Sequence, residues 1–91
     1  MQQTISIIVE GKVQGVFFRQ STAKKAIELG ITGEVSNLPD GSVAIIATGT
    51  DEKLEELTAW CRQGPSKAIV TAIVKKELPL RSFRDFSIQR S

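Results

Sequence analysis

β-Branched and apolar residues gather in three short runs that are typical of β-strands, at residues 4–10, 42–48 and 68–74. Between these runs lie two segments, residues 20–29 and 51–63, in which apolar residues recur at helical spacing and charged residues occupy other positions. The pattern therefore predicts strands that alternate with two amphipathic helices.

Glycine, proline and aspartate mark the breaks between these elements. Residues 33–38 form another strand-like run, and the turn Pro39-Asp40-Gly41 joins it to the following strand as a hairpin. Gly30 follows the first helical segment as a C′ residue, and Gly64-Pro65 ends the second. Residues 83–89, with apolar residues at 86 and 88, are expected to form a short final strand.

Each helical segment has an apolar face that we expect to be buried. In the first segment this face consists of Ala23, Ala26 and Ile27, with Ile31 beyond the helix end. In the second segment, which Thr50 is placed to cap, the face consists of Leu54, Leu57, Trp60 and Cys61. We expect Cys61 to be a buried, inert thiol and Trp60 to belong to the core or its rim.

The elements follow in the order β-α-β-β-α-β, with a fifth strand appended. This order is the split βαβ, ferredoxin-like arrangement, an α+β fold with an antiparallel sheet and both helices on one face. Ninety-one residues suffice for one modest core without disulfides or a metal. We therefore expect a single domain over residues 1–91.

Composition and charge exclude several kinds of function. The chain has no histidine and one cysteine, so an internal disulfide, a Cys/His metal site and a histidine-dependent catalytic triad are excluded. Its 12 basic and 10 acidic residues give a net charge of +2, too mild for a general nucleic-acid-binding surface. Neither a signal sequence nor an apolar run of about 18 residues is present. We expect a soluble, cytoplasmic monomer that binds neither nucleic acid nor a membrane.

The segment from Gly11 to Arg19 joins the first strand to the first helix and is the candidate binding loop. Gly11 and Gly15 allow positive φ angles and close approach of a ligand to the backbone. The segment is neither a Walker A motif nor a G-x-G-x-x-G dinucleotide fingerprint. Backbone amides at the start of a helix, followed by an arginine, are suited to binding an anion.

The side chains of this loop bear on the anion-binding hypothesis. Val16, Phe17 and Phe18 are apolar where turns are usually polar, so we expect them to point inward while the amides face a pocket. Arg19 falls in the first helical turn, where the helix dipole disfavours a cation, and this indicates a partner anion. The alternative for Arg19 is pairing with a carboxylate such as Glu10, or simple solvation.

Three motifs along the chain together resemble a known family. The first is Gly11-x-Val13-Gln14-Gly15-Val16-x-Phe18-Arg19. The second is Gly33-x-Val35-x-Asn37-x-x-x-Gly41-x-Val43, and the third, which is weaker, combines Gly64-Pro65 with Phe86-x-Ile88. These motifs are similar to those of the acylphosphatase family, and the resemblance covers essentially the whole chain.

The resemblance implies a small hydrolase that cleaves acyl phosphates to a carboxylate and inorganic phosphate. It implies that Arg19 binds the phosphoryl group together with the backbone amides of Gln14, Gly15, Val16, Phe17, Phe18 and Arg19. Asn37 is implied to position the water that attacks in line. The leaving carboxylate is a weak base of pKa ~4, so the reaction needs no strong general acid, and neither a metal nor a cofactor is implied.

Two residues beside Asn37 depart from the family pattern. Glu34 and Ser36 stand where the family usually has an aromatic residue and a basic or longer polar one. On a strand these two share one face, whereas Val35 and Asn37 share the other.

Two alternatives stay open. The domain could be a non-catalytic ferredoxin-like module that binds phosphorylated metabolites or RNA, although the strands before Phe83 lack the aromatic residues on which RNA bases stack. Asn37 could make only local backbone hydrogen bonds beside a turn.

Overall fold

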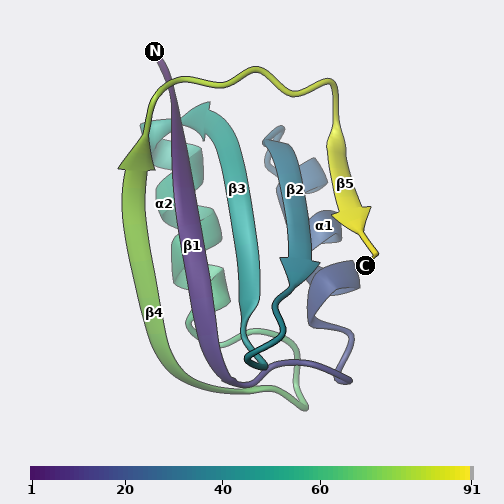
Figure 1. The fold of residues 1–91 in the computed structure, drawn as a ribbon. Coiled ribbons are helices and arrows are strands. Elements are labelled where there is room, and N and C mark those ends of the chain that lie inside the picture. Colours follow the sequence, from purple (N-terminus) through teal and green to yellow (C-terminus); the bar gives the residue numbers. More distant parts are fainter. Residues whose placement is uncertain (91) are drawn as a thin grey trace.

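The structure is a computed structural model that describes residues 1–90, and it contains a five-stranded sheet with two helices on one face (Figure 1). The elements in chain order are β1 Gln2–Lys12, α1 Phe18–Glu28, β2 Thr32–Asn37, β3 Val43–Thr50, α2 Asp51–Cys61, β4 Ile69–Leu78 and β5 Phe86–Gln89. The predicted ferredoxin-like α+β fold is confirmed. Neither helix of residues 1–90 is long and apolar enough to cross a membrane.

The strands lie in the order β4-β1-β3-β2-β5, so the last strand occupies an edge. The first four strands pair in an antiparallel manner, but β5 pairs with β2 in parallel. The prediction of a wholly antiparallel sheet is therefore wrong. The chain leaves β4 at one edge and crosses the end of the sheet to the opposite edge (Figure 1), so β5 enters where β2 begins. Phe86 is accordingly paired with Gly33.

The core lies between the helices and one face of the sheet. It includes Ile5, Ile7 and Val9 of β1, Val35 of β2, Val43, Ile45 and Ala47 of β3, and Leu54, Leu57 and Cys61 of α2. From α1 it takes Phe18, Ala23 and Ala26, with Thr22 also buried. Alternation along the strands and helical spacing in α2 thus produce the predicted core.

Ile27 is 63% exposed, contrary to the prediction that it lies on the buried face of α1. Phe18, Thr22 and Ala26 follow one another at a spacing of four residues and define that face. Ile27 follows Ala26 directly and is turned about 100° around the helix axis. The side chain therefore leaves the core, although its neighbours are buried.

The ends of the helices follow the predicted signals. Gly30 has φ 71°, its N–H donates to the Ile27 carbonyl, and the N–H of Ile31 donates to the Ala26 carbonyl, which is the Schellman pattern. At the start of α2, the Thr50 hydroxyl accepts from the Lys53 amide at 3.3 Å.

Gly33 explains one fixed position of the second sequence motif. Its φ is 146°, and a Cβ atom there would lie 1.9 Å from the carbonyl oxygen of Ile46. Strands β2 and β3 can pair at this point because residue 33 has no side chain.

Cys61 has no exposed surface, as predicted, and its burial raises the pKa of the thiol to about 12 from an ordinary value of 9.0. The thiol is therefore protonated in the folded protein at neutral pH and is neither an accessible nucleophile nor an anion.

This raised pKa predicts a specific loss of stability at alkaline pH. Above pH 9.0 the thiol of the unfolded chain ionises, whereas the folded one stays protonated until about pH 12. Ionisation stabilises the unfolded state, so the free energy of unfolding should fall by roughly 1.4 kcal/mol per pH unit within this window. Urea denaturation of wild type and Cys61→Ala at pH 8 and 10.5 should show the wild type losing about 2 kcal/mol more. Parallel pH profiles would contradict the assignment.

Candidate active site

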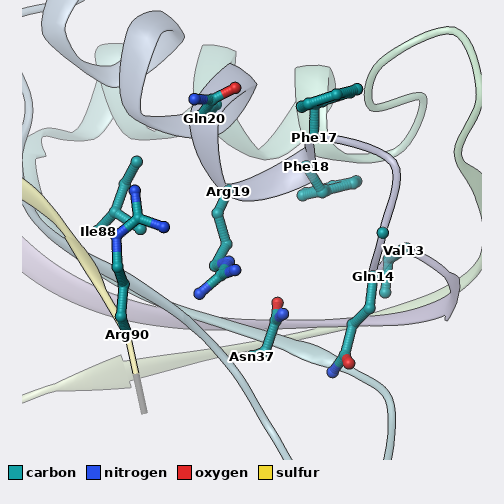
Figure 2. Close-up of a pocket in the computed structure, with 10 residues that line it drawn as sticks. Val13, Gln14, Phe17, Phe18, Arg19, Gln20, Asn37, Ile88 and Arg90 are labelled. Atoms are coloured by element: carbon teal, nitrogen blue, oxygen red, sulfur yellow. The ribbon is translucent and has the colours of Figure 1, made fainter.

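A pocket of about 290 Å³ opens between the start of α1 and the sheet (Figure 2). Its lining comes from residues 13–15 and 17–20, together with Asn37 at the end of β2 and with Ile88 and Arg90 at the end of the chain. The fold thus brings Arg19 and Asn37 to one pocket, as the resemblance implied. The volume is near the lower end of the range for small-molecule sites.

Positive φ angles shape the loop that enters α1. Gly15 has φ 74°, and Phe17 has φ 64°, the only positive value among the non-glycine residues that the structure describes. Val16 and Phe18 are buried, but Phe17 is 72% exposed at the pocket. The prediction that all three side chains point inward is wrong for Phe17, whose left-handed backbone directs its side chain away from the core while both neighbours are buried.

The amides of this loop are available to a ligand. Outside helices and strands, no backbone hydrogen bond of residues 1–90 is donated by an N–H from Gln14 to Arg19. The first N–H groups of α1 have no partner within the helix either. No side chain caps α1 and its first turn holds no acidic residue, whereas α2 has the Thr50 cap and two acidic residues. The positive end of α1 is thus left for an external anion.

Phe18 holds the loop against the core. Its ring is 1% exposed and lies 5.6 Å from the Trp60 ring at an angle of 57°. A Cβ atom at Gly64 would lie 2.5 Å from Phe18 Cε2, so the third motif needs glycine there to leave room for the ring. The expected position of Trp60 at the rim of the core is confirmed.

Arg19 is held in place by the last strand. Its Nη1 donates to the backbone carbonyl of Gln89 at 3.1 Å. Among residues 1–90 it forms no ion pair with Glu10, so that alternative is not what the structure shows. The guanidinium carries several N–H donors in a planar fork, and Arg19 lines the pocket.

Asn37 shares a sheet face with Val35, which is fully buried, and its side chain points toward α1 and Arg19 (Figure 2). Its Oδ1 is buried and accepts no hydrogen bond from any group of residues 1–90. Leaving a buried acceptor unpaired costs about 1–3 kcal/mol, so such an atom calls for an explanation. Because Asn37 lines the pocket, this unpaired acceptor lies beside the space that a ligand can enter.

Gln14 joins the two halves of the site, a role that sequence reasoning missed. Its Nε2 donates to the carbonyls of Leu38 at 2.8 Å and Ser42 at 2.9 Å, in the hairpin loop after Asn37. In the same loop Asp40 accepts two hydrogen bonds from Ser42, which lower the pKa of the carboxyl. The only sequence signal for this link was a glutamine inside the motif, and its partners are backbone groups without a sequence signature.

Glu34 faces away from the pocket. It lies on the opposite side of β2 from Val35, and its Oε1 is 3.9 Å from Arg81 Nη2. The prediction that Glu34 and Ser36 point away from Asn37 is confirmed for Glu34 by this ion pair.

Three further residues line the pocket: Ile88, which belongs to the third sequence motif, and Gln20 and Arg90, which sequence reasoning did not single out. Arg90 adds a second guanidinium, which rises from the end of β5 toward α1 (Figure 2). Only the parallel pairing of β5 with β2 brings it there.

Comparison with known proteins agrees with this geometry. Residues 5–88 match the family model described as Acylphosphatase. An acylphosphatase of Marinobacter nauticus is 51% identical over 81 residues, covering 88% of each chain, and one of Methylococcus capsulatus is 46% identical over 94% of this chain and 95% of its own. The structure of an acylphosphatase from Coxiella burnetii superimposes with a TM-score of 0.94 at 41% identity, over 97% of this chain and 93% of that one.

A family match over most of the chain, close relatives of nearly equal length and the shared fold lead to one conclusion. This chain belongs to the acylphosphatase family and is an enzyme that hydrolyses acyl phosphates.

Proposed function

We propose that Arg19 and Asn37 are the catalytic residues of this hydrolysis and that the amides from Gln14 to Arg19 bind the phosphoryl oxygens. The observation that carries the proposal is the buried, unpaired Oδ1 of Asn37 in the same pocket as Arg19 and the free loop amides. In this proposal the loop amides and Arg19 bind the phosphoryl group, and Asn37 positions the attacking water.

Binding comes from the loop and Arg19. The amides and the N-terminus of α1 direct partial positive charge at the phosphoryl oxygens, and the Arg19 fork contacts them through charge-assisted hydrogen bonds. Since the Gln89 carbonyl already orients the guanidinium, little reorganisation is needed when negative charge is redistributed in the transition state.

Attack comes from the side of Asn37. Its neutral amide cannot act as a base, but its Oδ1 can accept a hydrogen bond from water while its NH₂ donates to a substrate oxygen. The water oxygen forms a bond to phosphorus as the bond from phosphorus to the acyl oxygen breaks, in line. The electron pair leaves on the carboxylate, and the water proton passes to a phosphate oxygen of the substrate. Positioning and charge stabilisation account for this mechanism.

The observation that favoured a non-catalytic module does not apply to this structure. That alternative rested on Glu34 and Ser36 beside Asn37, but strand alternation places both on the opposite sheet face, where Glu34 lies 3.9 Å from Arg81. The acidic side chain therefore does not repel an anionic substrate at close range.

We further propose that the chain acts as one domain over residues 1–91 and as a cytoplasmic monomer, without a metal, a cofactor, nucleic acid or a membrane. Supporting this, relatives of nearly the same length carry the same enzyme name. We expect a monomer mass in sedimentation velocity and undiminished activity after dialysis against EDTA. A dimer at working concentration, or activity restored only by added metal, would contradict the proposal.

The main test uses benzoyl phosphate as substrate. Arg19→Ala should lower kcat/KM by about 100- to 1,000-fold, because it removes charge-assisted donors to the phosphoryl group. Asn37→Ala should lower kcat by about 100-fold with a small change in KM, since its water acts mainly in the transition state. Arg84→Ala, an exposed arginine outside the pocket, is the matched control. If either active-site variant had wild-type kinetics, the catalytic role assigned to that residue would be wrong.

The link made by Gln14 gives a second test. Gln14→Ala should remove the two hydrogen bonds to Leu38 and Ser42 and let the loop shift relative to Asn37. We expect kcat to fall by about tenfold, because small misplacements reduce in-line attack. Gln14→Glu should be at least as harmful, since a carboxylate cannot donate to these carbonyls. Steady-state kinetics at saturating benzoyl phosphate measure the effect, and an unchanged kcat in both variants would refute the positioning role.

A further inference from the structure

The pocket contains two guanidinium groups, those of Arg19 and Arg90, and no carboxylate among the residues that line it within the described chain. Two like charges at one small pocket repel each other and attract anions. Hydrolysis of a simple acyl phosphate accounts for only one of them.

Arg19 and the loop suffice for the phosphoryl group. The free amides from Gln14 to Arg19 and the fork of Arg19 offer donors for all its non-bridging oxygens. Arg90 is exposed, and its side chain makes no hydrogen bond or ion pair with another residue of 1–90. Its guanidinium is therefore available to a different part of the substrate.

The direction of attack indicates which part. In-line displacement places the leaving group on the side of phosphorus opposite to the attacking water. Asn37 holds that water under the proposed function, and in Figure 2 Arg19 lies between Asn37 and Arg90. The acyl group therefore extends toward Arg90, past the apolar side chain of Ile88.

We infer that Arg90 binds a second anionic group on the acyl part, so that the preferred substrates are acyl phosphates whose acyl group also carries a carboxylate. A guanidinium fork matches a planar carboxylate through two parallel hydrogen bonds. A carboxylate also suits the modest pocket volume of about 290 Å³. The carbon skeleton between the two anionic groups lies against Ile88. This inference rests on the proposed function.

Three substrates that differ only in a carboxylate test it: benzoyl phosphate, 3-carboxybenzoyl phosphate and 4-carboxybenzoyl phosphate. For wild type, kcat/KM should be about fivefold higher for at least one carboxylated isomer than for benzoyl phosphate, as for a partly exposed charge-assisted pair. The preference should shrink as salt is raised from 20 to 500 mM, because screening weakens the pair.

Arg90→Gln should bring the ratio of carboxylated to plain substrate close to one, with a much smaller loss for benzoyl phosphate itself. Arg90→Lys should keep part of the preference, since it keeps the charge and loses the fork. Arg84→Gln removes the same charge from the other end of β5 and should leave the ratio at the wild-type value.

Two results would overturn the inference while leaving the proposed function intact. One is a wild type that hydrolyses benzoyl phosphate but shows no preference for either carboxylated isomer. The other is an Arg90→Gln enzyme that loses activity equally on all three substrates, which would make Arg90 a general source of attraction for phosphate. Failure of wild type to hydrolyse benzoyl phosphate would instead count against the proposed function itself.

Discussion

The burial of Phe18 is the contact on which the site depends. The ring packs against Trp60 and occupies space that a side chain at residue 64 would fill, so Gly64 is needed there. The burial of the ring anchors the first residue of α1 in the core. Removing a buried phenylalanine typically costs about 3–5 kcal/mol, so this anchor is strong compared with any single loop hydrogen bond. Because Phe18 is fixed, the preceding loop can keep a left-handed residue and several unpaired amides, and the following residue, Arg19, is aimed at the sheet.

The edge strand β5 fixes the orientation of Arg19, whose backbone is positioned by the burial of Phe18. A ferredoxin-like sheet of four strands would leave Arg19 without the Gln89 carbonyl that orients it. The parallel addition of β5 beside β2 supplies that carbonyl together with Ile88 and Arg90, so the C-terminal strand forms one wall of the pocket. The orientation of Arg19 thus depends on a pairing between residues far apart in the chain, which links it directly to the integrity of the sheet edge.

An enzyme without histidine has to accelerate this reaction by positioning its substrate and water. With a good leaving group, the enzyme has to hold a phosphoryl group and a water molecule in line rather than move protons with strong acids or bases. The unpaired Oδ1 of Asn37 fits that demand under the proposed function, because a buried acceptor without a protein partner costs stability that binding a water molecule would restore. Gln14 then ties the loop that enters α1 to the hairpin loop after Asn37, the two parts of the site to which we assign phosphate and water.

The sequence by itself determined the features that follow local rules: strand alternation, the Thr50 cap, the Gly30 helix end, the buried Cys61 and the motifs that hold Arg19 and Asn37. Each depends on neighbours within a few residues or on a resemblance read along the chain. Only the tertiary structure decided that Phe17 and Ile27 point outward, that β5 pairs in parallel, that the Gln14 side chain bonds to the hairpin loop, and that Arg90 lines the pocket. These depend on backbone conformation and on contacts between distant strands, which no local pattern of residue types encodes.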